Sequence, residues 1–339
     1  MKISLSALLG LAISAHASTI EYTTVTGYFL QDETVTDPST FDYVSVNFGL
    51  INRTYPADKE LKHHQSTTQW ERFYNQVQKF NEDSPKNIEY KVLFLGRHGN
   101  GWHNSAETYY GTPAWNCYWA ELNGNSTVTW FDAALTPAGE AQALTTTSSA
   151  PLTRTLQTAN LTFNGLDLPH GSAAFAPVIK ELFREGISIH TCDHRHNKSY
   201  IHSIFPHWAI ESGFSEEDNL WNGVTAETSA AQDVRSTQAL GEVFFGESSK
   251  KKSYVSVTSH SGEISSILRV LGHRTFSLST GAVIPVLVKA EKKEGKATTT
   301  SVSWTASAHC TVAPITSVTA CVCPSSAAPV TTPLVATGY

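Results

Sequence analysis

The chain has 339 residues, which is enough for one large domain or two ordinary ones. Hydrophobic residues make up 40% of it and charged residues 16%, a balance typical of globular proteins and not of disordered ones. The formal net charge of -6 argues against a nucleic-acid-binding protein, which would normally present a basic face.

The N-terminus has the pattern of a secretory signal peptide. Lys2 precedes an apolar stretch over residues 3–13, and Ala15-His16-Ala17 forms a small-x-small cleavage site. The apolar stretch is too short to be a stable membrane anchor. We therefore expect cleavage of residues 1–17 and a secreted protein. Four N-x-S/T sequons agree with export, and we expect glycosylation among Asn52, Asn125, Asn160 and Asn197.

Cysteine usage fits an oxidising compartment. The chain contains Cys117, Cys192, Cys310, Cys321 and Cys323. Two disulfides and one free thiol are the simplest arrangement, although the pairing cannot be deduced from the sequence. Cys321 and Cys323 are one residue apart, so we do not expect them to pair with each other. No C-x-x-C spacing occurs, and we expect no metal site.

Regular elements are predicted first in the N-terminal extension, residues 18–88. Its first part, up to residue 65, is polar and turn-rich, and aromatic residues at helical spacing then predict one amphipathic helix over 66–81. A short apolar run predicts a buried parallel strand over 89–95. Thr136 and Pro137 predict the N-cap and first turn of a short helix.

Strands and helices alternate through the rest of the chain. We expect helices over 153–161, 226–245 and 263–271, and strands over 254–258, 282–290 and 299–306, the last two joined by a charged turn over 291–296. This alternation predicts an α/β protein, a three-layer α/β/α sandwich with a largely parallel central sheet, formed by residues 89–307. Residues 308–339 indicate a loosely ordered tail rich in Ser, Thr and Pro.

Two predicted strands end at histidines. Arg97-His98-Gly99 follows the strand over 89–95, and His260 directly follows the strand over 254–258. Ligands bind at the carboxyl ends of strands in α/β sheets. An arginine beside a histidine pairs a bidentate phosphate anchor with a nitrogen nucleophile, and Gly99 lets the backbone approach a ligand closely.

Further motifs follow in order: Leu135-Thr136-Pro137-Ala138-Gly139, Pro151-Leu152-Thr153-Arg154, and Leu182-Phe183-Arg184-Glu185. The whole series resembles the histidine phosphatase superfamily, in its phosphoglycerate-mutase-like branch, over roughly residues 90–290. The resemblance implies that His98 is the nucleophile that becomes phosphohistidine and that Glu185 is the proton donor. It also implies a phosphate pocket made of Arg97, Asn104, Arg154 and His260, in which His260 is the second catalytic histidine and donates to the phosphoryl oxygens.

The resemblance implies a secreted phosphomonoesterase that acts on a small phosphorylated substrate. Two arginines and a histidine would supply positive charge to the phosphoryl oxygens, so we expect neither a metal nor another cofactor. A phosphomutase is the alternative within the same chemistry. The substrate and the oligomeric state stay open.

The chain departs from the family pattern just before Arg154. Ala150 stands where the family usually has a serine, and only residues 140–149 separate Gly139 from Ala150. The family has a helix, a loop and a buried strand in this interval, so we expect the strand to be missing and Arg154 to be displaced. The chain would then be either a gene product that lacks a segment or a natural variant. It could act as a catalytically impaired binding protein.

Two clusters lie outside these motifs. Tryptophans gather in and beside the insertion over residues 101–129, at Trp102, Trp115, Trp119 and Trp130. We expect them to line the insertion, which would shape leaving-group specificity. A carbohydrate-active protein is an alternative based on the same tryptophans. Zinc-type ligands follow Glu185, but on a strand they would be too extended to meet one ion. We expect a rim of the substrate entrance at His190, Cys192, His194 and His196.

Overall fold

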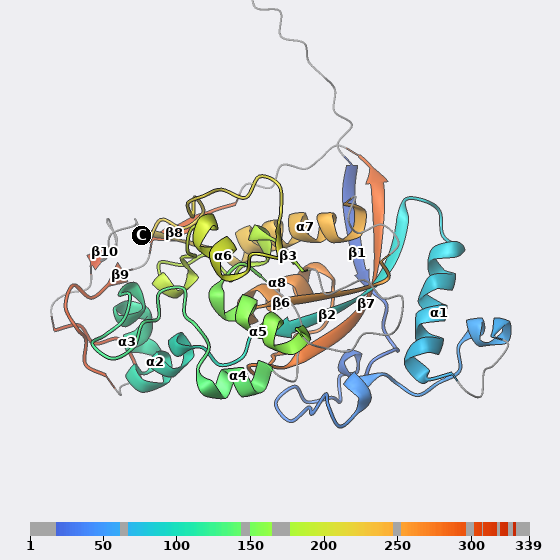
Figure 1. The fold of residues 1–339 in the computed structure, drawn as a ribbon, viewed down its shortest axis with the longest axis horizontal. Helices are drawn as coiled ribbons and strands as arrows, with labels where there is room; N and C mark the ends of the chain where they lie inside the picture. Colours follow the sequence, from blue (N-terminus) through green and yellow to red (C-terminus); the bar gives the residue numbers. More distant parts are fainter. Residues whose placement is uncertain are drawn as a thin grey trace, which may run out of the picture.

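The computed structural model describes residues 18–61, 67–143, 150–164, 177–246, 252–295, 302–306, 308–316, 319–324 and 328–329. The signal peptide predicted over residues 1–17 lies outside these residues. Residues 144–149, part of the interval in which we expect the family's strand to be missing, lie outside them too. The described residues form an α/β fold with helices packed on both faces of a central sheet (Figure 1).

The central sheet contains four strands in the order β1-β7-β2-β6. β2 (Ile88–Arg97) pairs in parallel with β6 (Tyr254–Ser259) and antiparallel with β7 (Val283–Glu294). β1 (Ser18–Thr24) pairs antiparallel with the other side of β7. The α/β class is confirmed, but the described sheet is not largely parallel, because the loop over residues 271–282 returns the chain to the edge where β2 ends.

Successive residues of β2 point into two separate cores. Leu93 and Leu95 pack with side chains of α7 (Ser229–Phe245) and α8 (Ser261–Val270) on one face. Val92 and Phe94 pack with α1 (Gln69–Glu82) on the other face. Because strand residues alternate between the two faces and both faces are covered, β2 is apolar along most of its length. This arrangement is the predicted three-layer order.

The N-terminal segment contributes more to the fold than its polar sequence predicts. β1 is an edge strand of the sheet, and the turns after it bury Phe29, Leu50 and Tyr55 against α1. The described part of this segment contains three short 3₁₀ helices, η1 (Leu30–Asp32), η2 (Asn47–Gly49) and η3 (Pro56–Glu60). The predicted amphipathic helix is confirmed as α1, whose N-cap is Thr68.

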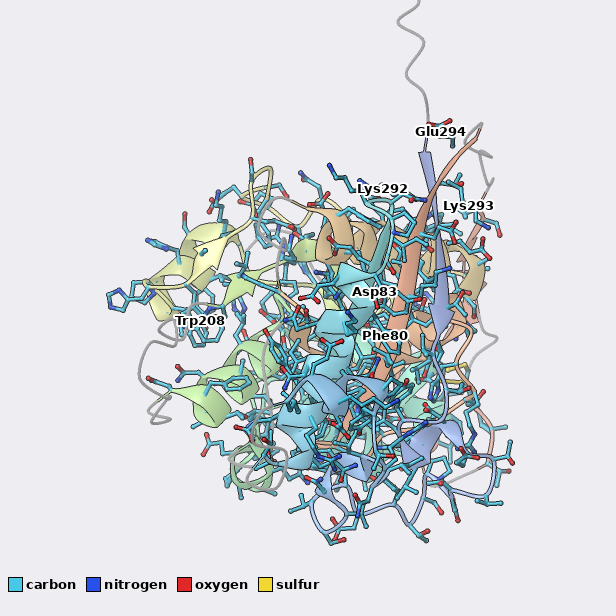
Figure 2. The ribbon with its side chains drawn as sticks, turned by 90° about the vertical axis from the view of Figure 1, so that its right-hand side faces the viewer. Phe80, Asp83, Trp208, Lys292, Lys293 and Glu294 are labelled. Atoms are coloured by element: carbon cyan, nitrogen blue, oxygen red, sulfur yellow. A yellow bond between two sulfur atoms is a disulfide. The ribbon has the colours of Figure 1, made fainter. Side chains whose placement is uncertain are left out.

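The charged end of β7 differs from the prediction. Residues 291–294, expected in a turn, continue the strand and pair with β1. Lys292, Lys293 and Glu294 lie at the far end of this exposed two-stranded ribbon (Figure 2). Lys293 forms an ion pair with Glu21 of β1, so charge in this segment supports strand pairing. Of the strand expected over 299–306, the described part is β8 (Trp304–Ala306), which pairs with β5 (Thr225–Glu227) and not with the central sheet.

The remaining elements surround the carboxyl ends of β2 and β6. They are α2 (Trp102–Tyr110), α3 (Thr112–Cys117), η5 (Trp119–Glu121), α4 (Pro137–Ala143), α5 (Thr153–Phe163), β3 (Val178–Ile179), η6 (Glu181–Phe183), η7 (Thr191–Asp193), α6 (Lys198–Ile204), β4 (Ala209–Ile210), β9 (Ala308–His309) and β10 (Ala328–Pro329). Within the described ranges, none of the helices has both the length and the apolar character needed to cross a membrane.

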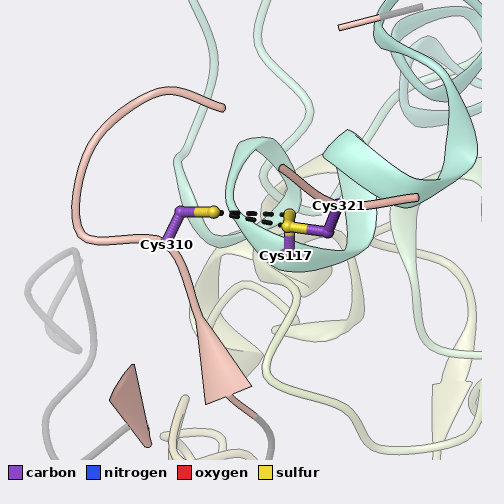
Figure 3. A group of neighbouring side chains, drawn as sticks. All are labelled: Cys117, Cys310 and Cys321. Carbon is purple, nitrogen blue, oxygen red and sulfur yellow. Dashed lines mark hydrogen bonds between the residues drawn. A yellow bond between two sulfur atoms is a disulfide. The ribbon is translucent and has the colours of Figure 1, made fainter. Parts of the chain in front are cut away.

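One disulfide ties the C-terminal segment to α3, and a second closes a loop within that segment. Cys117 pairs with Cys321, and Cys310 pairs with Cys323, while Cys192 is a buried free thiol. Figure 3 shows Cys117, Cys310 and Cys321 side by side, with the sulfur of Cys310 lying 3.3 Å from that of Cys321 and 3.7 Å from that of Cys117. The prediction of two disulfides and one free thiol is confirmed.

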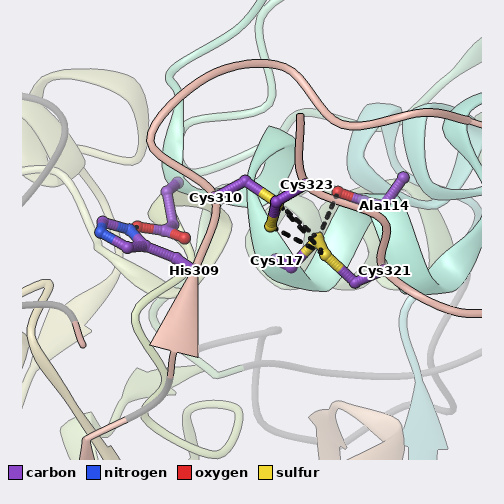
Figure 4. The surroundings of a disulfide bond; sticks show 7 residues. Ala114, Cys117, His309, Cys310, Cys321 and Cys323 are labelled. Atoms are coloured by element: carbon purple, nitrogen blue, oxygen red, sulfur yellow. Dashed lines mark hydrogen bonds and ion pairs between the residues drawn. A yellow bond between two sulfur atoms is a disulfide. The ribbon is translucent and has the colours of Figure 1, made fainter. Parts of the chain in front are cut away.

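The C-terminal segment is more ordered than predicted as far as Cys323. Cys310 is fully buried, and the imidazole of His309 lies 2.7 Å from the Glu121 carboxylate (Figure 4). The expectation of a loose tail is therefore wrong for the described residues of this segment. Three of the five cysteines lie there, and their bonds to each other and to α3 hold the chain in place.

Candidate active site

The site lies where β2 and β6 end. The backbone of His98 donates to the Ser259 carbonyl, and the carbonyls of Arg97 and His98 accept from Gly281 N. Arg97 also donates through Nη1 to the Leu278 carbonyl at 2.8 Å. The loop after β2 is thereby held to both neighbouring strands.

His98 is buried and held as one tautomer. Its Nδ1 lies 2.7 Å from the Gly99 carbonyl, which can only accept, so Nδ1 carries the proton and Nε2 keeps its lone pair. Burial, and then the cation of Arg154, hold the pKa of His98 well below its usual value. The imidazole is therefore neutral and nucleophilic at Nε2.

Arg154 contacts His98 directly. Its Nε lies 3.3 Å from His98 Nε2, and the side chain is buried near the start of α5. The sequence led us to expect this arginine to be displaced by the short interval before it, but the structure places it at the site. Ala150, in the position of the usual serine, is buried and accepts from the Thr155 hydroxyl through its carbonyl.

Other residues of the motifs join the loops that carry the site. Thr158 Oγ1 on α5 accepts from Gly99 N, and Gln157 Oε1 accepts from Leu135 N. Gly139 at α4 lies against the loop after β2, because a Cβ on Gly139 would be 2.0 Å from the Asn100 carbonyl oxygen. The motif over residues 135–139 therefore needs glycine for close packing of two backbones.

His260 is the N-cap residue of α8 and faces His98, with 5.1 Å between the ring centroids. Among the described residues, both of its ring nitrogens are buried without a hydrogen-bond partner, and so is Nε of Arg97. Buried polar atoms are normally paired. A phosphoryl group, with its several oxygen atoms, would give these groups partners.

Glu185 lies against the N-terminus of α8. Its carboxylate accepts from the backbone N–H groups of Gly186, Gly262 and Glu263 at 2.8, 3.2 and 3.0 Å. Burial, and then the nearby Asp193 carboxylate, raise the pKa of Glu185 above its usual value. A carboxyl group with a raised pKa is suited to donate a proton.

Asn104 has a structural contact that the sequence did not predict. Its Oδ1 accepts from Gly101 N at the start of α2, and its predicted role in binding phosphate stays a prediction. The residue before it, His103, was missed by the sequence analysis. Its buried ring lies 5.3 Å from that of His98 between centroids. The signal available was only its place in Arg97-His98-Gly99-Asn100-Gly101-Trp102-His103.

The tryptophans of the insertion form a core of their own. Trp115 and Trp130 are buried in one cluster with Tyr110, and partly buried side chains around them include Trp102 and Trp119. The rings thus pack on each other within the insertion, and their expected influence on leaving-group specificity stays a prediction. Their number reflects the need for a separate core beneath α2 and α3.

The histidine-rich stretch is a turn and not a strand. His194 is buried and stacks on Trp221, and His196 stacks on Tyr200. The ligand atoms of His190, Cys192 and Asp193 lie within 4.8 Å of one another, as those of a metal site would. The guanidinium of Arg154 beside Asp193 disfavours a cation there, and burial raises the pKa of the Cys192 thiol.

The predicted sequons differ in exposure. Asn52 and Asn125 are exposed. Asn160 is partly buried on α5, and Asn197 accepts from Tyr200 N as the N-cap of α6. Asn52 is the most open position for a glycan, since Asn125 also donates to the Tyr110 hydroxyl.

Known proteins resemble this chain in sequence. A protein of Arthroderma benhamiae named "probable phosphoglycerate mutase" is 43% identical over 84% of this chain and 89% of its own length. A probable phosphoglycerate mutase from Saccharomyces cerevisiae is 32% identical, over 73% of this chain and 92% of its own length. A "phosphomutase-like protein 3" of Candida albicans is 40% identical, over 59% and 66% respectively. No family model matches the chain.

Solved structures align more loosely. A phosphoglycerate mutase from Thermus thermophilus is 19% identical, covers 57% of this chain and 91% of its own, and has a TM-score of 0.29. A phosphoserine phosphatase variant from Entamoeba histolytica, in complex with phosphoserine, is 18% identical, covers 58% and 94%, and has a TM-score of 0.31.

Proposed function

This chain belongs to the phosphoglycerate-mutase-like branch of the histidine phosphatase superfamily, and on that premise we propose that it is a phosphomonoesterase working through a phosphohistidine at His98. The observation that carries the proposal is the state of His98. Its Nδ1 proton is held by the Gly99 carbonyl, so Nε2 keeps its lone pair, which accepts from Arg154 Nε and would turn to phosphorus when a phosphoryl group arrives.

The reaction would proceed in two steps. In the first, His98 Nε2 attacks phosphorus, the bond to the leaving oxygen breaks, and the Glu185 carboxyl donates its proton to that oxygen. In the second, the Glu185 carboxylate takes a proton from water, which attacks the phosphohistidine and releases inorganic phosphate. Arg97, Arg154 and His260 would stabilise the charge on the phosphoryl oxygens, which is the main demand of phosphoryl transfer.

Secretion is part of the proposal. The predicted signal peptide and the exposed sequons at Asn52 and Asn125 support it. Four of the five cysteines are paired in disulfides, an arrangement typical of proteins in oxidising compartments.

The test is hydrolysis of an aryl phosphate by the purified protein, in the presence of a chelator, beside His98→Ala. His202→Ala, on the exposed face of α6, is the matched control. We expect wild type and the control to release phosphate and His98→Ala to be inactive. Brief exposure to ³²P-labelled substrate should leave an acid-labile label on wild type and the control only. Unchanged turnover in His98→Ala would refute the proposal.

A phosphomutase is the second candidate, because relatives of this chain are named probable phosphoglycerate mutase or phosphomutase-like protein. A mutase returns the phosphoryl group to a bound intermediate, while a phosphatase gives it to water. Incubation with a phosphoglycerate separates the two activities. Isomerised product without release of inorganic phosphate would favour the mutase. Phosphate binding without either reaction would indicate the impaired binding protein.

A further inference from the structure

We propose that Asp193 is a positioning residue of the site, whose carboxylate fixes the direction in which the Arg154 guanidinium points. The inference rests on the proposed function, since it concerns an arginine assigned to the phosphoryl group. It also gives the histidine-rich stretch a role, because Asp193 lies in the loop over residues 188–196 that contains it.

The guanidinium of Arg154 is held at each of its three nitrogens. Nη1 donates to the Cys192 carbonyl at 2.7 Å, and Nη2 lies 3.4 Å from Asp193 Oδ1. The third nitrogen, Nε, lies against His98 Nε2. Two contacts from one loop thus orient a planar group with a fixed fork of donors. A phosphoryl group arriving at His98 would meet the guanidinium already aimed at it.

Asp193 is itself held by the loop. The Ser188 hydroxyl donates to Asp193 Oδ2 at 2.6 Å, and the backbone turns through η7 at this point. Arg184 donates to the Asp193 carbonyl, and both of its Nη atoms bind Asp218 at 2.6 and 2.7 Å. Arg184 and Asp218 are buried, so the backbone of Asp193 is held in place by a paired internal charge.

The same loop is joined to the start of α5. One buried carboxylate, Asp132, accepts from Thr153 N at 2.8 Å and from the Thr153 hydroxyl at 2.9 Å. It also accepts from His196 N at 3.1 Å, and His196 Nδ1 lies 2.7 Å from it. The backbone that carries Arg154 and the loop that holds its side chain are therefore fixed to one group. This explains how the arginine reaches His98 despite the short interval before it.

Asp193 also affects the proposed proton donor. The charged and titratable groups around Glu185 include Asp193 and Cys192 from the loop, Glu263 from α8, Arg235 from α7, Arg154 from α5 and Arg97 from β2. After burial, Asp193 is the largest cause of the raised pKa of Glu185. Removal of its charge should therefore let Glu185 lose its proton at lower pH.

The test is Asp193→Asn, with Asp233→Asn as the matched control. Asp233 pairs with Arg269 at 2.6 Å on the exposed face of α7 and α8. We expect Asp193→Asn to lower kcat about 100-fold, the loss typical of a 1 Å misplacement. The alkaline limb of its pH profile should move to lower pH. Binding of inorganic phosphate should change little, because the loss of the Asp193 charge, which repels phosphate, offsets the less exact orientation of the Arg154 guanidinium. Ser188→Ala keeps the negative charge of Asp193, so the alkaline limb of its pH profile should not move.

Two results would overturn the role of Asp193. One is a kcat for Asp193→Asn equal to that of wild type. The other is a lower kcat with a lower melting temperature and an unmoved alkaline limb, which would indicate a purely structural role. The proposed function could fail separately, if wild type hydrolyses no phosphate ester. In that case, a ¹³C NMR titration of the Glu185 carboxyl in wild type and Asp193→Asn still tests the influence of Asp193.

Discussion

At the scale of single residues, His98 and Glu185 need opposite protonation states, and burial provides both. Burial disfavours the charged form of each group, so it lowers the pKa of His98 and raises that of Glu185. Burial therefore favours the neutral imidazole and the protonated carboxyl group that the two proposed roles require.

This pair predicts the pH profile of kcat/KM. Activity should fall in acid as His98 gains a proton, at a pH well below its ordinary pKa of 6.5. It should fall in base as Glu185 loses its proton, at a pH above its ordinary pKa of 4.5. Glu185→Gln should lower kcat about 100-fold or more and remove the alkaline limb. The profile is measured with two substrates, an aryl phosphate whose leaving group has a low pKa and an alkyl phosphate whose leaving group has a high one. An alkaline limb that persists in Glu185→Gln would assign it to another group.

Gly262 gives a second prediction at this scale. A Cβ on this residue would lie 2.3 Å from Glu185 Oε1, so the carboxylate can sit at the N-terminus of α8 only because position 262 is glycine. We expect Gly262→Ala to displace Glu185 and to lower kcat about 100-fold. Gly241→Ala on α7 is the control, since its Cβ would have a nearest contact of 3.4 Å. The control should keep its activity and gain up to about 1 kcal/mol in the free energy of unfolding. Equal activity of both variants would show that Glu185 needs no such space.

At the scale of elements, α7 and α8 are joined through a buried acid. Glu263 on α8 accepts from Gln232 and Ser236 on α7 and pairs with Arg235 at 3.1 Å. Burial raises the pKa of Glu263 to about 7 from 4.5. Between pH 4.5 and about 7, the folded protein therefore keeps a proton on Glu263 that the unfolded chain has released. The stability that this group contributes is fully present below pH 4.5 and is lost as the pH rises through 7.

We therefore predict a pH-dependent term in the free energy of unfolding. Between about pH 4.5 and 8 the wild type should lose about 3 kcal/mol through this group. Glu263→Gln should lose less over the same range, and Glu242→Gln, on the more open side of α7, should behave as wild type. Urea titrations at both pH values measure the difference. An equal change in the free energy of unfolding with pH in wild type and Glu263→Gln would contradict the assignment of this term to Glu263.

Elements with a regular pattern were predictable, and those that depend on distant partners were not. The aromatic spacing of α1 and the apolar runs of β2 and β6 come from local burial, so the sequence alone contains them. β1 has too few apolar residues to be recognised, because it is an edge strand that pairs only with β7. Charge patterns suggested a turn at Lys292 and Lys293, although strand pairing places them in a ribbon.

The site followed the same division. His98, His260 and Arg154 could be proposed because each lies in a sequence motif beside a predicted strand or helix. The structure brings the three side chains together. Their catalytic roles stay predictions. Asp193 and His103 could not be assigned, since their importance depends on contacts between segments far apart in the sequence.

At the scale of the whole molecule, the two disulfides differ in the length of chain that they close. Cys117 and Cys321 are separated by 204 residues, and Cys310 and Cys323 by 13. A longer closed loop restricts the unfolded chain more. We expect the double change Cys117→Ser with Cys321→Ser to cost about 2 kcal/mol more than Cys310→Ser with Cys323→Ser. Guanidinium titrations of both variants measure this, and equal losses would show that native contacts and not chain entropy decide the cost.

The anchors on either side of residues 144–149 have a consequence for how this family can change in evolution. α4 is fixed at its start, where Thr136 Oγ1 donates to Asn100 and Gly139 packs on the same residue. α5 is fixed at its own start by Asp132. Both anchors are made by described residues outside this segment, so we expect insertions and deletions there to leave Arg154 beside His98. We therefore expect changes in length to be tolerated better there than within α4 or α5.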